Sequence, residues 1–420
     1  MPGPLSGVRI LDLTRILAGP WATQNLADLG AEVIKIERPG CGDDTRQMGP
    51  PFLHDADTGG RGDAAYFLSC NRGKESVAID LALPEGRALV RALAAECDVL
   101  IENYKVSGLA KYELDYLTLH AALPELIYCS VTGFGQTGPY RQRAGYDYLI
   151  QGMGGLMSVT GERDDRPGGG PQRAGVALAD ILSGMYATVA ILAALRHRDQ
   201  GGGGQHIDIG MLDVQVAVLA NQGINYLTTG VPPRRMGAGH PNIAPYQPFR
   251  AADGYIILAI GNDAQFRRMC RAMERDDIGG DPRFRTIGER VAHVDELTPL
   301  LESITRTRTI DAWVAAMEAV DVPCGPVNTI DRVFADEQVK SRGMRLELEH
   351  SRYGRVPSIG NPMRLSETPV AYRQGPPALG EHTHATLQRV LGLSDAELDR
   401  LTRAGVIESA VPQSTRPVSA

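Results

Sequence analysis

The stretch "VRILDLTRILAGPWATQNLADLGAEVIKIE", residues 8–37, decides the fold. It opens with the short β-rich run "VRILDL", continues with helical spacing in "GPWATQNLADLG" and ends in the strand-like run "AEVIKIE". This order predicts a strand, a crossover helix and a second strand parallel to the first. Further apolar runs at 97–104 and 125–135 follow helical stretches, which is typical of a parallel sheet with helices on both faces. The first half of the chain therefore predicts a doubly wound α/β fold.

The usual nucleotide-binding motifs of such sheets are absent from the sequence. The first crossover carries "LAGPWA" instead of G-x-G-x-x-G, so the fingerprint of a nicotinamide or flavin cofactor is missing. Four glycines at 201–204 lie between a long apolar helix and a strand, but they lack the Lys-Ser/Thr of a phosphate loop. We interpret them as a flexible turn, and the sheet as Rossmann-like without its usual ligand.

Composition excludes several classes of protein. The 420 residues are 43% apolar and 22% charged, which suits a globular chain of about two or three domains. The net charge of −7 is spread along the chain, so neither a nucleic-acid surface nor a polybasic membrane patch is expected. No window approaches the ~18 apolar residues of a membrane span. Six cysteines without a C-x-x-C pair indicate reduced thiols, and a cytoplasmic location is expected.

No metal site is expected either. The one close histidine pair, His382 and His384 in "GEHTHATL", is interpreted as part of a loop or helix start. The helical spacing of "ATLQRVLGL" and "DAELDRLTRAGV" predicts two closing helices, and "MRLELEH" and "NPMRLSE" before them are strand-like.

The chain changes character near residue 225. The segment "GVPPRRMGAGHPNIAPYQPF" is rich in Gly and Pro and can form neither a long helix nor a central strand. A strand and several helices then form a smaller unit that ends near "VPCGPVNT". We predict a large domain in 1–225, a small domain with its crossing linkers in 226–329, a return to the large domain in 330–408 and a flexible tail in 409–420.

Asp180 is a lone carboxylate among small and apolar side chains in "GVALADILSGMYA". It stands directly before an apolar helical run from Ile181 to Arg198, so we expect it to be the N-cap of that helix. The same place lowers the cost of an ionised carboxylate in a nearly apolar niche, and leaves a poorly hydrated anion that is able to attack an electrophile. The two interpretations are compatible.

Ordered motifs over almost the whole chain resemble the class III CoA-transferases, the family of formyl-CoA transferase and carnitine CoA-transferase. The matches are "LSGVRILDLTRILAGP", "LGAEVIKIERPGCGDDTR", "LIENY", "VTGFGQTGPY" with "RAGYD", "GVALADILSGMYA", "GQHIDIGMLDV", "VPCGPVNT" and "LGEHT". The resemblance implies a Rossmann-like parallel-sheet large domain plus a smaller α/β domain, and an interlocked homodimer. It also places the catalytic carboxylate of the family at Asp180.

The reaction that the resemblance implies is a transfer of coenzyme A between carboxylic acids. Asp180 would attack the thioester to form a mixed anhydride, and the released thiolate would attack the aspartyl carbonyl to form an enzyme-bound thioester. An acceptor acid would then reverse the sequence. Both additions develop an oxyanion, for which "GAGHPN", with Gly237, Gly239 and His240, is our candidate. The alternative is that this segment is only an inter-domain connector.

The resemblance also assigns coenzyme contacts residue by residue. They comprise the loop after the first strand, the arginine that ends the second strand, a stretch that borders the adenine, the "ENY" match, a basic residue for a phosphate and the "GYD" match. In this sequence they are Ile16, Leu17 and Ala18; Arg38; Ile79 and Asp80; Asn103 and Tyr104; Lys111; and Tyr146 and Asp147. Without the resemblance, Arg38 and Lys111 would be interpreted as exposed surface charges. Oxalate-directed members carry a glutamine where this chain has Leu17, which disfavours oxalate.

The substrate class follows from the branch that the motifs resemble most, the succinyl-CoA:glutarate and succinyl-CoA:itaconate group. A dicarboxylate needs a cation for its non-reacting carboxylate, and Arg46 and Arg173 flank the expected pocket. Either could equally be a structural ion-pair partner. We expect carboxylic acids, CoA thioesters and a second copy of the chain as partners. The alternatives are a CoA-transferase for a different acid, an acyl-CoA racemase of the same fold, a CoA-binding protein without activity and a purely structural protein.

Overall fold

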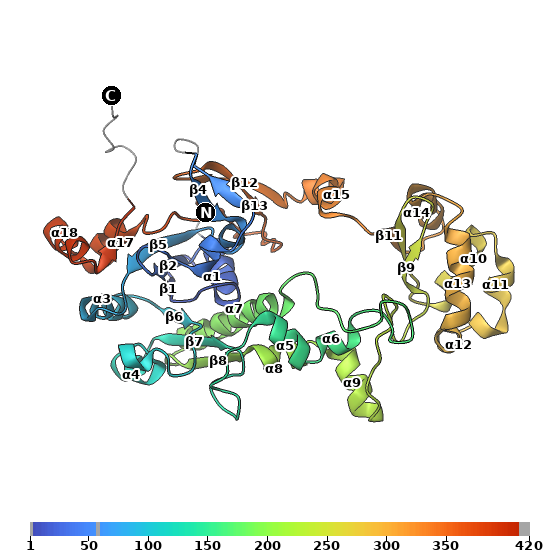
Figure 1. Ribbon diagram of the computed structural model, residues 1–420, viewed down its shortest axis with the longest axis horizontal. Coiled ribbons are helices and arrows are strands. Elements are labelled where there is room, and N and C mark those ends of the chain that lie inside the picture. The colour runs from blue at the N-terminus through green and yellow to red at the C-terminus, as the bar shows by residue number, and fades with distance from the viewer. Residues whose placement is uncertain (1–2, 56–58, 411–420) are drawn as a thin grey trace. The chain divides into compact units, whose positions relative to one another are not determined.

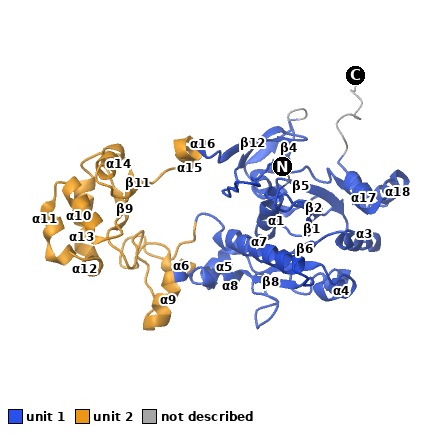
Figure 2. Ribbon diagram, turned by 180° about the vertical axis from the view of Figure 1, so that it is seen from behind, with its two compact units in different colours: residues 1–155, 175–220, 340–420 blue, residues 156–174, 221–339 orange. Residues whose placement is uncertain are grey.

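The computed structural model describes residues 3–55 and 59–410 and divides the chain into two compact units (Figure 2). Unit 1 comprises Met1–Gly155, Gly175–Ala220 and Lys340–Ala420, and unit 2 comprises Leu156–Ala174 and Asn221–Val339. The chain thus leaves the large unit and returns, as expected, but with other boundaries: 156–174, which we placed in the large domain, belongs to the small unit. Most of the expected tail, 411–420, lies outside the described residues.

A seven-stranded sheet forms the centre of unit 1, in the order β14-β5-β2-β1-β6-β7-β8 (Figure 1). All neighbours pair in parallel except β14 with β5. The strands are β1 (Arg9–Asp12), β2 (Glu32–Glu37), β5 (Lys74–Ile79), β6 (Val99–Glu102), β7 (Ile127–Thr132), β8 (His206–Gly210) and β14 (Ile407–Glu408). This topology confirms the doubly wound α/β fold. The order reverses between β1 and β6, which is where such sheets bind their ligands.

Helices cover both faces of this sheet because alternate strand residues point to opposite sides. Ile10, Val33 and Val99 pack with α1 (Ala18–Asp28) and α7 (Leu178–Asp199) on one face. The next residues along the same strands, such as Leu11 and Leu100, pack on the other face. That second face is covered by α3 (Pro84–Ala95), α4 (Tyr116–Ala122), α17 (Thr383–Leu391) and α18 (Asp395–Arg403). The two helices expected at the end of the chain are thereby confirmed.

Helix α7 is held against α1 by a glycine. A Cβ at Gly184 would lie 2.5 Å from the carbonyl oxygen of Ala18, so only glycine permits this approach.

Contrary to our expectation, α7 is long and apolar enough to cross a membrane by length and composition alone. In the structure its residues Ala187 and Ile191 belong to the core that also contains the sheet. A core helix meets the same criterion, so the composition of α7 does not indicate a membrane span.

Shorter elements complete unit 1. They are η1 (Asp44–Gln47), β3 (Phe52–His54), β4 (Arg61–Ala64), α2 (Ala65–Leu68), η2 (Ala110–Tyr112), α5 (Asp147–Met153), α8 (Met211–Ala217), β12 (Arg345–His350) and β13 (Gly354–Ile359). The strand expected in "MRLELEH" is β12, which pairs with β13. The strand-like run "NPMRLSE", residues 361–367, is a loop, so that prediction was wrong.

Unit 2 contains a three-stranded antiparallel sheet, β11-β10-β9, packed against helices. Trp313, Phe266 and Leu301 lie in its own hydrophobic core, and the Trp313 indole donates a hydrogen bond to the carbonyl oxygen of Thr305 at 2.7 Å. Its elements are α6 (Leu156–Val159), α9 (Ala220–Thr229), β9 (Tyr246–Arg250), β10 (Tyr255–Ala259), α10 (Asp263–Ala272), α11 (Asp276–Gly280), η3 (Pro282–Phe284), α12 (Ile287–Ala292), α13 (Val294–Thr305), α14 (Ile310–Glu318), β11 (Cys324–Pro326) and α15 (Ile330–Ala335); α16 (Glu337–Ser341) crosses back to unit 1.

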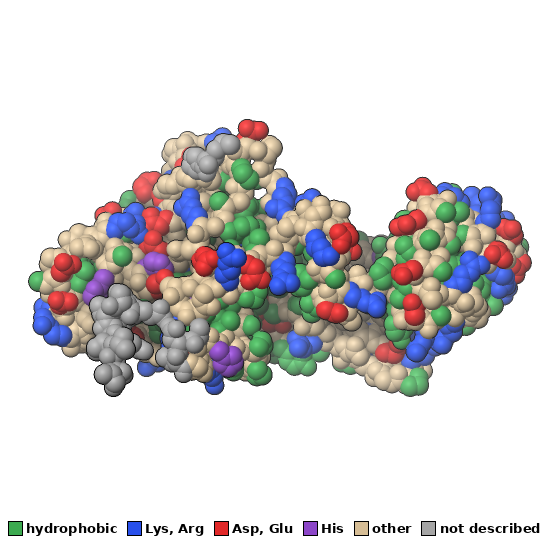
Figure 3. All heavy atoms as spheres, turned by 90° about the horizontal axis from the view of Figure 1, so that it is seen from above, with side chains coloured by type: hydrophobic (Ala, Val, Ile, Leu, Met, Phe, Trp, Pro, Cys, Tyr) green, Lys and Arg blue, Asp and Glu red, His purple; other side chains and the backbone are tan. Residues whose placement is uncertain are grey.

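Charged side chains are mixed over the surface of each unit. On the face drawn in Figure 3, Lys and Arg side chains stand among Asp and Glu side chains rather than in one large block. This agrees with the even spread of charge along the sequence.

Candidate active site

The main cavity of unit 1 has a volume of about 880 Å³ and opens at the carboxyl ends of β1, β6 and β7, where the strand order reverses. The residues that line it come from the loops after these strands, from the segment before α5 and from the start of α7. They are Arg15, Ile16, Leu17, Ala18, Asp44, Met48, Asn103, Tyr104, Lys105, Val106, Ser107, Gly108, Lys111, Tyr112, Val131, Thr132, Gly133, Arg141, Arg143, Ala144, Gly145, Tyr146, Asp147, Asp180 and Met211. A cavity of this size can hold a large cofactor.

Asp180 faces this cavity from the first turn of α7, but it is not the N-cap. The helix begins at Leu178, its N-cap is Ala177, and no side chain of the helix's own first residues caps it. The capping carboxylate is Asp147 at the start of α5, whose Oδ1 accepts hydrogen bonds from the backbone N–H groups of Ala179 at 2.9 Å and Asp180 at 3.4 Å. Our N-cap prediction for Asp180 was therefore wrong. Because the Asp147 carboxylate caps the helix, the Asp180 carboxylate is not needed as a cap and can take part in a reaction.

The environment of Asp180 disfavours its charged form. Burial raises the pKa of its carboxyl to about 7, and the negative charge of Asp147 adds to the effect. Burial raises the pKa of the Tyr66 hydroxyl of α2 to about 12, and the negative charge of Asp180 adds to this shift. The carboxylate of Asp180 is thus poorly hydrated at neutral pH, which favours nucleophilic attack once it is ionised.

Cationic side chains surround the rest of the cavity. Besides Lys111, which the sequence predicted, they are Arg15, Lys105, Arg141 and Arg143. Arg143 lies over the rings of Phe134 and Tyr140, with its guanidinium carbon 5.3 and 4.6 Å from their centroids. Several cations on one wall suit an anionic ligand such as a phosphate ester. Sequence reasoning missed Arg141 and Arg143, although Arg143 begins the quoted run "RAGYD" and Arg141 lies two residues before it.

A second cavity of about 370 Å³ adjoins the first and shares Arg15, Asp44, Tyr104 and Tyr112 with it. It opens after β2 and β5, and Arg38, Ile79 and Asp80 line it. Each predicted coenzyme contact therefore lies in one of the two connected cavities, although the sequence spacing between them is large. The structure thus brings these residues together, while their roles stay predictions.

The Asn103 residue lines the cavity, and its side chain also bonds to the backbone of the loop after β1. Its Oδ1 accepts from the N–H of Arg15 at 2.9 Å, and its Nδ2 donates to the carbonyl oxygen of Arg15 at 2.7 Å. The side chain thereby joins the loop after β6 to the loop after β1.

Arg46 is a structural ion-pair partner. Its side chain is 2% exposed and donates to both carboxylate oxygens of Glu37, at 2.8 and 2.7 Å, and to Asp63 at 2.8 Å. The guanidinium carbon also lies 3.6 Å from the Phe67 ring centroid. Arg46 lines neither cavity, so our prediction that it binds the distal carboxylate of a substrate was wrong and the alternative we left open holds.

The remaining predicted residues, Arg173, Gly237, Gly239 and His240, belong to unit 2. The His240 ring lies against Tyr246, with centroids 5.3 Å apart, and its Nδ1 accepts from the N–H of Asn242 at 3.1 Å. Gly237 has φ +63, a conformation that favours glycine. The roles of these four residues stay predictions.

Metal ligands do not gather in the part of the chain that the structure describes: residues 3–55 and 59–410 contain no group of three or more His, Cys, Asp and Glu side chains that could hold an ion. His382 is the N-cap residue of α17, and His384 contacts Thr402 at 3.1 Å, so both lie at a helix start, as interpreted from the sequence.

Comparison with known proteins identifies the family. Residues 5–383 match CoA-transferase family III, and the chain belongs to that family. It is 51% identical over 400 residues to the succinate–glutarate CoA-transferase of Agrobacterium fabrum, covering 95% of this chain and 97% of that one. It is 42% identical over 405 residues to the human succinyl-CoA:glutarate CoA-transferase, covering 96% and 90%. A CAIB/BAIF family protein from Brucella suis, 49% identical, superposes with a TM-score of 0.83 over 93% of this chain and 100% of that one.

Proposed function

We propose that this enzyme transfers coenzyme A from succinyl-CoA to glutarate through an aspartyl-CoA thioester on Asp180. The observation that carries the proposal is the position of Asp180, a partly buried carboxylate that faces a cavity of about 880 Å³ lined with cations. Relatives named as succinate–glutarate and succinyl-CoA:glutarate CoA-transferases support the choice of substrates.

In the proposed complex the CoA thioester occupies the two connected cavities. The adenine nucleotide end lies in the smaller cavity beside Arg38, Ile79 and Asp80. Lys111 and Arg141 of the main cavity meet its phosphates, where each ion pair favours binding. The thioester end then reaches Asp180 at the start of α7. This arrangement assigns a use to Arg38, Ile79, Asp80 and Lys111 of the predicted coenzyme set.

The transfer consists of four displacements at carbonyl carbons. An oxygen of ionised Asp180 attacks the succinyl carbonyl, the C–S bond breaks, and CoA thiolate leaves a mixed anhydride. The thiolate attacks the aspartyl carbonyl, succinate leaves, and the aspartyl-CoA thioester remains. A glutarate carboxylate attacks this thioester and again expels CoA thiolate, which attacks the glutaryl carbonyl of the new anhydride. Glutaryl-CoA and free Asp180 result, with no net proton uptake.

Replacement of Asp180 tests the proposal. Asp180→Asn keeps the shape of the side chain but removes the nucleophile, and we expect transfer from succinyl-CoA to glutarate to fall by at least ~1000-fold. The matched control is Asp115→Asn: Asp115 is an aspartate at another helix start, where it caps α4 through the N–H of Thr118, and it lies outside both cavities. That control should lose little stability, because asparagine caps a helix about as well as aspartate, and should keep its activity. Full activity in Asp180→Asn would refute the mechanism.

The acceptor is a dicarboxylate in this proposal, because a second carboxylate that enters a partly dry pocket must be paired. Since Arg46 is occupied by Glu37 and Asp63, Arg173 is the remaining candidate of the two arginines. We expect Arg173→Ala to raise the KM for glutarate and to leave the KM for succinyl-CoA within about twofold. An unchanged KM for glutarate would exclude Arg173 from this role.

We also propose that the chain forms an interlocked homodimer. Large apolar side chains on neighbouring helices of unit 1 are exposed: Tyr148 of α5 at 61%, Val189 of α7 at 60% and Val216 of α8 at 55%. Exposed large apolar side chains on neighbouring helices favour a protein interface, and a homodimer would bury them against a second copy. Light scattering should give twice the 45.2 kDa mass of one chain. A stable monomer at micromolar concentration would contradict the proposal.

A further inference from the structure

The loop between β1 and α1, residues 13–17, holds an unfavourable backbone conformation at the wall of the main cavity. Ile16 has φ +71, in the left-handed region that β-branched residues rarely adopt. Ile16 and Leu17 both line the cavity. Such a conformation persists only where surrounding groups hold it, and it is often found at functional sites.

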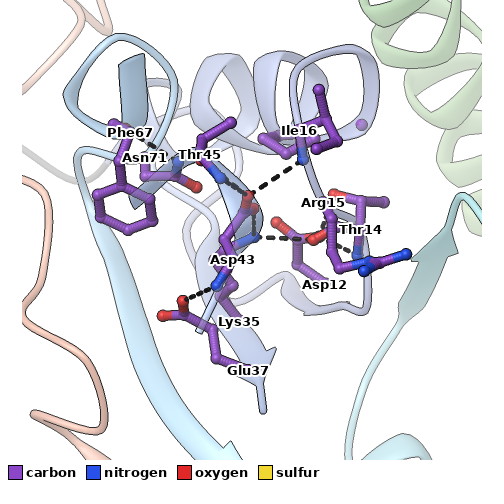
Figure 4. Close-up of polar contacts among 12 residues, drawn as sticks. Asp12, Thr14, Arg15, Ile16, Lys35, Glu37, Asp43, Thr45, Phe67 and Asn71 are labelled. Atoms are coloured by element: carbon purple, nitrogen blue, oxygen red, sulfur yellow. Dashed lines mark hydrogen bonds and ion pairs between the residues drawn. The ribbon is translucent and has the colours of Figure 1, made fainter. Parts of the chain in front are cut away.

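Two buried charges hold this loop from below (Figure 4). The Lys35 ammonium donates a hydrogen bond to the carbonyl oxygen of Thr14 at 2.8 Å. The Asp43 carboxylate accepts one from the N–H of Ile16 at 3.2 Å. Lys35 and Asp43 also form an ion pair of 2.9 Å in which both side chains are 0% exposed. The pair therefore contacts the loop on both sides of Arg15.

Neighbouring groups fix the position and charge of the pair. Asp43 Oδ1 also accepts from the backbone N–H of Thr45 at 2.9 Å and from its hydroxyl at 2.7 Å, and Glu37 accepts from the N–H of Asp43 at 2.8 Å. The charge of Lys35 and these hydrogen bonds lower the pKa of Asp43 to about 2, although burial opposes the shift. The pKa of Lys35 is raised by Asp43, Asp12 and Glu37 against the effect of burial. Both groups stay charged through the neutral range.

Unit 1 contains another buried ion pair, Arg72 and Asp28, which does not contact the loop 13–17. Arg72 and Asp28 are 2.6 Å apart and 5% and 2% exposed. The remaining donors of Arg72 bond to Ser358 and Ile359 of β13, not to a residue of the main cavity. Both pairs tie segments of the chain together, but only the Lys35–Asp43 pair bonds to a residue that lines the main cavity, Ile16.

We propose that Lys35 and Asp43 are positioning residues of the transfer reaction, which hold the strained loop 13–17 in the form that binds the CoA thioester. The inference rests on the proposed function, because that function assigns the main cavity to the coenzyme. Both residues also line the smaller cavity, but their side chains are 0% exposed, so each acts through a backbone group of the loop. Loss of the pair should therefore weaken thioester binding more than it slows the chemical steps.

Two double variants isolate the contact with Ile16. Lys35→Met with Asp43→Leu replaces the pair by apolar side chains, of which leucine keeps the branched shape of aspartate, and the change leaves no unpaired charge. Lys35→Met with Asp43→Asn is equally uncharged, but its amide oxygen still accepts from Ile16. Arg72→Met with Asp28→Leu is the matched control, because it removes a buried ion pair that does not contact the loop.

Hydrogen exchange of peptide 13–18 in the ligand-free protein, and the KM and kcat for succinyl-CoA, are the measurements. For the Leu variant we expect exchange at Ile16 to be at least tenfold faster and the KM to be at least tenfold higher, with kcat within threefold. In the control, both quantities should stay within threefold of the wild type. The Asn variant keeps the Ile16 acceptor but loses the Lys35 hydrogen bond to Thr14, so it should lie between the control and the Leu variant. Adding Ile16→Gly to the Leu variant should lower its KM again, because glycine adopts φ +71 without strain.

Two results would overturn the inference: a Leu variant with unchanged exchange, or one with faster exchange and an unchanged KM. If the Leu variant does not fold, Lys35→Met with Asp43→Ala takes its place, because alanine also lacks an acceptor for the N–H of Ile16. Unchanged exchange at Ile16, or an unchanged KM, in that variant would count against positioning. A wild type without turnover of succinyl-CoA would refute the proposed function instead, while the exchange data would still decide whether the pair holds the loop.

Discussion

Asp180→Asn should make the protein more stable at high pH, although it removes the proposed nucleophile. The carboxyl has a pKa of about 7 in place of the ordinary 3.8, because burial and Asp147 disfavour its ionised form. A raised pKa means that the group contributes most to stability below pH 3.8 and loses this contribution as the pH rises through 7. At about 1.4 kcal/mol per tenfold change in proton affinity the full loss is about 4 kcal/mol. Partial exposure to solvent reduces the expectation to about 2 kcal/mol.

Denaturant unfolding of wild type and Asp180→Asn between pH 4 and pH 8 measures this effect. Asparagine resembles the protonated aspartic acid, so the two free energies of unfolding should agree near pH 4. At pH 8 the variant should be more stable by about 2 kcal/mol. An N-cap role would give at most a small loss, from the missing charge at the helix start, because asparagine caps a helix about as well as aspartate. A variant that is equally or less stable at pH 8 would refute the reasoning about the Asp180 environment.

Three further predictions concern neighbouring residues and the acceptor. Asp147→Asn keeps an oxygen that caps α7 but removes the negative charge beside Asp180, so the acid limb of the kcat profile should move to lower pH; a limb that stays in place would contradict this electrostatic account. Arg141→Ala should raise the KM for succinyl-CoA about tenfold and make it less sensitive to salt in a titration with NaCl, because one cation of the cavity wall is lost. Arg46→Met should destabilise the fold by about 3 to 5 kcal/mol in a thermal or denaturant melt, since Glu37 loses its buried partner, and should leave the preference for glutarate over butyrate unchanged.

Much of the large unit could be predicted because local pattern and tertiary structure agree there. The run 8–37 contains two buried strands and an intervening helix, and each forms where the spacing of apolar residues indicates. The domain boundaries were harder to predict. Residues 156–174 join the small unit through contacts that are distant in sequence. The run "GERDDRPGGGPQR" at 161–173 is rich in Gly, Pro and charged residues, but this composition does not show which unit the segment joins. The loop at 361–367 has strand-like spacing but lacks a partner strand in the structure, so periodicity alone misled the prediction.

Within the site, the position of a residue could be predicted where the backbone determines it. The role of a residue could not be predicted where it depends on a partner that is distant in the sequence. The loops after the parallel strands meet at one edge of the sheet, so Ile16, Asn103 and Asp180 share a cavity as expected. Arg46 was misjudged because Glu37 and Asp63 become its neighbours only when the chain folds. The helix cap was misplaced for the same reason: the capping carboxylate comes from another helix.

Peptide mass spectrometry of the protein after incubation with succinyl-CoA alone tests the central claim most directly. Without an acceptor, the aspartyl-CoA thioester should accumulate, and the peptide that contains Asp180 should gain the mass of CoA less one water. Addition of glutarate should remove this mass and release glutaryl-CoA, and Asp180→Asn should show neither change. An adduct on another residue, or turnover of wild-type protein with no adduct on Asp180 under rapid quenching, would contradict the proposed function.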